Sequence, residues 1–161
     1  KDTVEKFGKT AELLGELPKE SPFFYLMETA RNLCLVLEKK ADLGREIRLA
    51  YSQEDKETLQ EIANIKIPVL LQRLQDFYQS FRTQWNLENK SFGFEVQTVR
   101  IGGLLQRLKD VQEILNAYLR EEIPGIAELN EPQKAFHYFE QNEIRSLNYN
   151  LWTDIVSPSK I

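Results

Sequence analysis

The 161-residue chain contains very few of the side chains from which most catalytic and metal centres are built. It has a single cysteine, Cys34, and a single histidine, His137. One cysteine excludes both an internal disulfide and a cysteine-rich zinc cage. His137 lies between Phe136 and Tyr138 with no nucleophile motif beside it, so no Ser-His-Asp or Cys-His arrangement is recognisable. We therefore predict no catalytic, cofactor-binding or metal-binding residue in this chain.

Long apolar runs and a charge excess of one sign are also missing. No stretch approaches the roughly 20 apolar residues that span a bilayer, and no basic-then-apolar signal peptide opens the chain. The 21 basic and 25 acidic residues are mixed and give a net charge of -4. We therefore predict neither a nucleic-acid partner nor a membrane partner. The start at Lys1 indicates a piece of a longer chain, so the compartment stays open, and the single cysteine fits a reducing one such as the cytoplasm.

What the chain does contain is a helical spacing of apolar residues. With 42% hydrophobic residues it can bury one core. Apolar residues recur every three or four positions over 22–51, from Ser52 to about Trp85, and over 94–122, and a shorter amphipathic segment covers 3–16. Long segments joined by short turns favour antiparallel neighbours. The sequence predicts an all-α fold: one domain (1–161) made of an elongated antiparallel three-helix bundle with a short N-terminal helix (core 22–129) and a largely irregular tail (130–161).

Local signals refine this prediction. Ser21-Pro22 is a typical helix start, Ser52 and Asp55 resemble a capping box, and Pro68 predicts a kink or break near 64–67. In the tail, alternating apolar residues at 147, 149 and 151 predict an extended segment. The buried stripe expected on the first long helix contains Phe23, Met27, Ala30, Cys34, Leu37, Ala41 and Gly44. The stripe expected on the third contains Val96, Val99, Leu104, Leu108, Val111, Leu115, Tyr118 and Leu119.

The segment from Trp85 to Arg107 joins the second long helix to the third. It contains a Trp, a Lys, a Glu, two Arg and three Gly, which the packing of a helical bundle alone does not require. Arg100 and Arg107 fall on the predicted apolar stripe, where a guanidinium needs a carboxylate or carbonyl partner. Gly102 and Gly103 lie in mid-helix, at a cost of about 1 kcal/mol each relative to Ala, which indicates close approach of another group. Either the arginines pair with acids of neighbouring helices and the glycines allow tight crossing, or this corner docks another domain or rims a ligand pocket. The candidate contact residues are Trp85, Asn89, Lys90, Glu95, Arg100, Gly102, Gly103 and Arg107.

Several segments resemble one known family. LEKKADLGREIRLAY (37–51), WNLENKSFGFEV (85–96), RIGGLLQRL (100–108), IAEL (126–129) and, further on, NLW (150–152) resemble the C-terminal helical domain of bacterial family 20 glycoside hydrolases, the β-N-acetylhexosaminidases. In that family an Asp-Glu pair of a TIM barrel acts with the substrate's own N-acetyl group. This chain has no strand-helix alternation and no Asp-Glu dipeptide. The resemblance implies a non-catalytic domain without a cofactor that packs against the barrel of its parent enzyme and can contribute to a homodimer interface.

Two other functions stay open. The first is a free-standing helical interaction module that binds a partner helix in a groove between its own helices. The second is a sugar-binding module that stacks sugars on Trp85, Tyr78 and Tyr149. An apolar groove along the bundle would favour the interaction module, whereas an exposed patch at the corner would favour the supporting role. Enzymatic activity of the chain itself is least favoured, because no positioned acid-base pair is visible.

Overall fold

The computed structural model describes residues 2–131, which form helices joined by short connections, with no strand among them. The all-α prediction is confirmed. His137, Tyr149 and most of the predicted tail lie outside the described residues. The helices are α1 (Asp2–Gly15), α2 (Phe24–Lys40), α3 (Leu43–Ser52), α4 (Lys56–Glu61), the π-helical turn η1 (Ile62–Lys66), α5 (Ile67–Glu88), α6 (Phe94–Leu119) and α7 (Ala127–Asn130).

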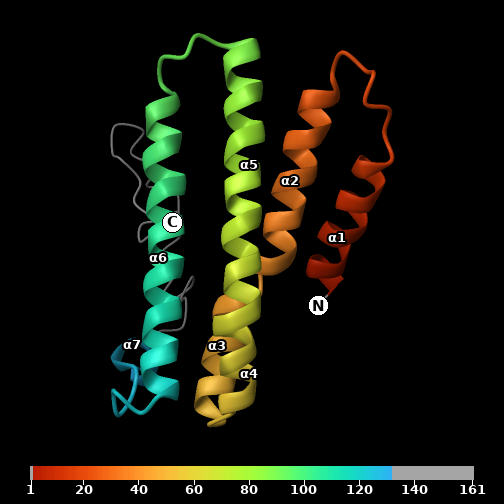
Figure 1. Ribbon diagram of the computed structural model, residues 1–161. Helices are drawn as coiled ribbons and strands as arrows, with labels where there is room; N and C mark the ends of the chain where they lie inside the picture. Colours follow the sequence, from red (N-terminus) through yellow and green to blue (C-terminus); the bar gives the residue numbers. More distant parts are fainter. Residues whose placement is uncertain (1, 132–161) are drawn as a thin grey trace, which may run out of the picture.

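The longer helices lie side by side in the order α6, α5, α2, α1 (Figure 1). α5 and α6 are antiparallel neighbours, as predicted, and α2 packs on the other side of α5. α1 packs on α2 at the edge of this array, so the short N-terminal helix extends the bundle by one more neighbour. α3, α4 and α7 gather at the end of the molecule opposite the α5–α6 connection (Figure 1).

The first predicted long helix is wrong in its middle, because α2 ends at Lys40 and α3 begins at Leu43. Asp42 precedes α3 and accepts a hydrogen bond from Arg45 (3.2 Å). The predicted stripe is wrong as well: Ala30, Ala41 and Gly44 are exposed, whereas Thr29 and Val36 are buried. α2 is packed on two sides, by α1 and by α5, so its buried residues do not follow one stripe. Because the helix is interrupted between Lys40 and Leu43, the buried positions of α3 do not continue the spacing of those in α2.

Cys34 is half-buried on α2, and burial raises the pKa of its thiol. A raised pKa disfavours the reactive thiolate at neutral pH. This agrees with its prediction as a packing residue.

The π-helical turn η1 lies where Pro68 was predicted to disturb the helix. The Ile67 N–H donates to the carbonyl of Ile62, five residues earlier, and Pro68 has no N–H to continue the regular pattern. This shift leaves the carbonyl of Ala63 without its usual helical donor. Gln112 of α6 donates its Nε2–H to that carbonyl (2.7 Å). The helix therefore continues from α4 into α5 through a turn whose freed backbone group is bonded to a neighbouring helix.

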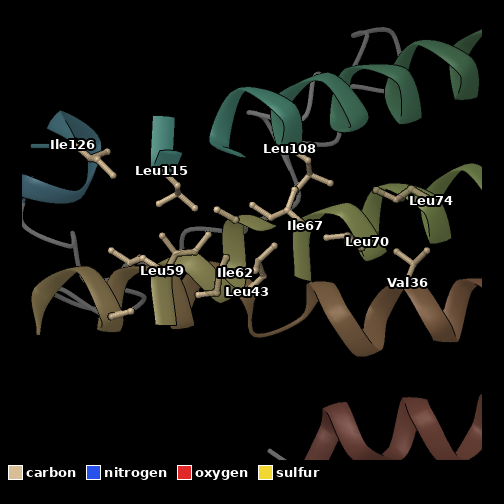
Figure 2. Close-up of a cluster of buried hydrophobic side chains, with 13 residues drawn as sticks. Val36, Leu43, Leu59, Ile62, Ile67, Leu70, Leu74, Leu108, Leu115 and Ile126 are labelled. Carbon is tan, nitrogen blue, oxygen red and sulfur yellow. The ribbon is translucent and has the colours of Figure 1, made fainter. Parts of the chain in front are cut away.

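The core runs along the centre of the array and joins every element from α2 to α7. Figure 2 shows side chains of α2, α3, α4, η1, α5 and α6, together with Ile126 just before α7, converging on one cluster. Its largest fully buried members come from α4, η1, α5 and α6. Apolar contacts therefore hold the C-terminal half of α6 to the other helices. These members are Leu59, Ile62, Ile67, Leu70 and Leu115.

Asp55 begins α4, whereas Ser52, which was predicted to take part in this start, is the last residue of α3. The Asp55 carboxylate accepts from the Thr58 N–H (2.9 Å) and from the Thr58 hydroxyl (2.7 Å). These bonds hold the pKa of the Asp55 carboxyl below its ordinary value. Since the pKa is lower in the folded than in the unfolded chain, this group stabilises the fold at neutral pH.

We expect that stabilisation to be lost in acid. It is complete above the unfolded pKa of about 3.9 and disappears as the pH falls through the lower folded pKa. Asp55→Asn keeps an acceptor at the helix start but does not titrate, so its urea midpoint should fall less between about pH 5 and pH 2 than that of the wild type. Glu113→Gln, at an exposed position on α6, is the control. Equal acid losses in wild type and Asp55→Asn would contradict this account.

Candidate functional site

The predicted corner is the connection between α5 and α6. Trp85 donates its indole N–H to the carbonyl of Lys90 (2.9 Å), and Asn89 ends α5 by donating its N–H to the Trp85 carbonyl (2.8 Å). Gly93 precedes α6 with φ +94, a conformation that favours glycine, and its N–H donates to the Glu95 carboxylate (2.8 Å). Four predicted residues, Trp85, Asn89, Lys90 and Glu95, therefore lie together at this turn, and each contributes an atom to one of its hydrogen bonds.

An aromatic cluster joins α5 and α6 next to this corner. Trp85 is half-buried, and its ring lies 5.7 Å from Phe94 and 6.2 Å from Phe81 between centroids. Tyr78 lies 5.6 Å from Phe94, and its hydroxyl is 3.0 Å from that of Thr98. Trp85 and Tyr78 both pack on Phe94, so their rings contribute to packing between α5 and α6. This packing weakens the case for their use as a pair of sugar-stacking platforms.

The two arginines of α6 have different environments. Arg107 is about half exposed and pairs with Glu128 of α7 (3.5 Å), which is the internal pairing foreseen for it. Arg100 is half-buried, and its Nε is buried without a hydrogen-bond partner in the part of the chain that the structure describes. Its predicted internal acid is therefore not found there. Within residues 2–131 the Arg100 Nε–H therefore has no acceptor.

Gly102 does not have the close neighbour that was expected of it. Gly102 is exposed, and a Cβ placed there would have no atom within 4 Å, so no described group packs closely over it. Gly103 is half-buried and lies one turn after Val99. Tight crossing by a neighbouring helix is therefore not found at Gly102 among the described residues.

Sequence reasoning missed the most exposed apolar residues of the corner. Phe92 is 90% exposed and Leu87 is 64% exposed. Val96 and Val99, which were predicted to be buried, are 37% and 56% exposed. The buried residues of α6 repeat with a spacing of seven through Phe94, Leu108 and Leu115, with the half-buried Ile101 between the first two, and Val99 lies on the opposite side. Counting from these buried residues would have identified the outer valines.

The opposite end of the bundle holds α7 on α3. The Tyr51 hydroxyl accepts from the Ile126 N–H (3.0 Å) and donates to the Asn130 amide oxygen (2.9 Å). Arg48 donates to the carbonyls of Glu128, Leu129 and Glu131 at 3.3 to 3.4 Å. A small pocket of about 240 Å³ lies between α3, α6 and α7, and its apolar lining includes Ile47, Val111, Ile114 and Leu129.

Removing the Tyr51 hydroxyl should loosen α7. Tyr51→Phe keeps the ring but removes the acceptor of the Ile126 N–H and the donor to Asn130. We expect amide hydrogen exchange over 126–130 to become faster, with a net loss of about 0.5–1.5 kcal/mol for each hydrogen bond. Tyr78→Phe, which removes a hydroxyl at the other end of the bundle, should leave this exchange unchanged. Unchanged exchange in Tyr51→Phe would contradict this function of the hydroxyl.

The described residues show neither a metal cluster nor a membrane-spanning helix. Among residues 2–131 no group of three or more His, Cys, Asp or Glu side chains is placed to hold a metal ion. No helix in the described range is long and apolar enough to cross a membrane. The corner at α5–α6 and the small pocket at α7 are two surfaces on which apolar side chains are exposed.

Comparison with known proteins identifies one family. The family model described as the Glycoside Hydrolase 20C C-terminal domain matches residues 2–148, which is most of the chain and includes every described helix. No curated protein shows a significant match. The matched range includes both the corner and the α3–α7 junction.

Proposed function

Since the chain belongs to the glycoside hydrolase 20C C-terminal domain family, we propose that it is a non-catalytic domain that packs against and supports the catalytic barrel of its parent enzyme, a β-N-acetylhexosaminidase. The family match carries this proposal. The parent's Asp-Glu pair would lie in the barrel, and the supporting domain would contribute rigidity and contact area rather than chemistry.

The architecture fits a supporting role. The elements from α2 to α7 share one apolar core, and close packing makes the surface that they present stiff. Large exposed apolar side chains gather at the α5–α6 corner, where Leu87, Phe92 and Val99 are each more than half exposed. Grouped exposed apolar side chains are typical of surfaces that contact another protein unit.

The test of this proposal measures whether the catalytic domain and this chain associate. The catalytic domain of the parent enzyme is produced alone and mixed with the 161-residue chain. We expect a complex in sedimentation velocity, a higher Tm of the catalytic domain, and no hydrolysis of an aryl N-acetylglucosaminide by the chain alone. Failure to associate at high micromolar concentration, or hydrolysis by the purified chain, would overturn the proposal. Sedimentation of the chain alone tests the proposed contribution to a homodimer.

A second candidate function, a helical module that binds a partner helix, is supported by the small pocket between α3, α6 and α7. Its apolar lining by Ile47, Ile114 and Leu129 could receive one or two side chains of such a helix. Ile114→Asp separates the two functions, because Ile114 is 41% exposed at the pocket and far along α6 from the corner. This substitution should leave association with the catalytic domain unchanged, whereas the interaction module would lose its partner.

A further inference from the structure

The pocket between α3, α6 and α7 lies close to the point where the described residues end. Its apolar lining includes Ile47, Ile114 and Leu129, and Ile114 is 41% exposed. Leu129 lies two residues before Glu131, the last residue that the structure describes. We propose that this pocket binds segment 136–139 of the same chain, which reads FHYF and so carries three aromatic side chains. This contact is independent of the proposed function.

Arg48 holds the chain at the rim of this pocket as it leaves α7. The Arg48 guanidinium donates to the carbonyls of Leu129 and Glu131, both at 3.3 Å, and Arg48 itself lines the pocket. Glu131 has φ -68 and ψ 136, so its backbone is extended and α7 does not continue through it. Phe136 follows Glu131 by five residues, which span at most about 18 Å. The first aromatic residue after α7 is therefore tethered within reach of the pocket.

The size and the lining of the pocket suit an aromatic side chain. Its volume of about 240 Å³ is below the roughly 300–1,000 Å³ of sites that enclose a drug-sized ligand. Two charged side chains line it, and both have partners: Arg48 donates to carbonyls of α7, and Glu128 pairs with Arg107 (3.5 Å). The surface left for an occupant is therefore largely apolar, and an aromatic ring can remove much of it from water.

A segment of the same chain has an advantage over a separate molecule at this pocket. A short tether gives the segment an effective concentration of about millimolar, so a few apolar contacts are enough to bind it. The family match runs through residue 148, so segment 136–139 belongs to the matched domain, whereas Tyr149 and Trp152 lie beyond the match. These observations favour segment 136–139 as the occupant over a helix of another protein.

A double-mutant cycle on the 161-residue chain tests whether the pocket and the segment interact. Ile114→Ala changes the pocket, and replacement of Phe136 and Phe139 together by alanine changes the segment. Because both changes remove the same contact, we expect the unfolding equilibrium constants from urea titration to show a coupling of about threefold or more. Val69→Ala on α5, where Val69 is 39% exposed, is the matched control and should show no coupling with the segment. Independent effects of Ile114→Ala and the segment replacements would overturn the proposal.

Hydroxyl-radical footprinting gives a second readout, with the 90% exposed Phe92 as the reference for an unprotected ring. In the wild-type chain Phe136 and Phe139 should be oxidised several times more slowly than Phe92. Ile114→Asp should raise both rates to that of Phe92, whereas Val69→Asp should leave both rings protected. Equal rates for the three rings in the wild type would show that the segment does not dock and that the pocket is open to a partner helix. Protection that Ile114→Asp does not relieve would place the segment elsewhere and would also contradict the proposal.

Discussion

Leu70→Ala should lower the free energy of unfolding by about 2–5 kcal/mol. Leu70 is fully buried in the first turn of α5, in the cluster that also contains Val36 of α2 and Leu108 of α6 (Figure 2). Truncation removes three carbons from this contact and leaves a cavity that three packed helices cannot readily close. At this chain length we expect Tm to fall by roughly 4–20 °C. Urea titration followed by far-UV circular dichroism measures the loss.

The control is the same substitution at Leu13, which is 65% exposed on α1. Leu13→Ala should change the free energy of unfolding by no more than about 0.5 kcal/mol, because surface substitutions usually have small effects. The slope of the urea transition should stay the same in both variants, since the surface exposed on unfolding is nearly unchanged. Similar losses in the two variants would mean that the centre of the array is not the core.

The sequence predicted most of the architecture because helical periodicity is a local property. The bounds of α1 and α6 are close to the predicted 3–16 and 94–122, and η1 lies where Pro68 was expected to interrupt the helix. The break at Asp42 was missed because no proline or glycine precedes it, and both α2 and α3 have ordinary helical sequences. The two-sided packing of α2 is a tertiary effect that no local pattern records.

The predicted corner lies at the α5–α6 connection, but the contacts of its individual residues could not be assigned from the sequence. Trp85 was read as a docking anchor because exposed aromatics often are, whereas its ring packs on Phe94 and its N–H donates to Lys90. Val99 was read as buried because a broad apolar stripe on α6 hides which of its sides faces α5. Which face of a helix meets its neighbour depends on partners distant in sequence, so exposure at the corner emerges only from the fold.

Replacing Gln112 by leucine should cost about 1–3 kcal/mol, although the substitution adds an apolar side chain to a helical position. The Gln112 amide donates to the Ala63 carbonyl, which has no backbone donor in the π-turn. Because Ala63 is fully buried, water cannot readily replace the Gln112 donor. Gln106→Leu on the same helix is the matched control, because the Gln106 amide bonds only to the exposed Asp110 one turn away (2.8 Å). That variant should lose no more than about 0.5 kcal/mol. Equal urea midpoints for the two variants would mean that the bond between Gln112 and Ala63 does not stabilise the turn. A larger loss in Gln112→Leu, together with faster amide exchange over 62–67, would show that α6 stabilises the interruption that Pro68 imposes on the neighbouring helix.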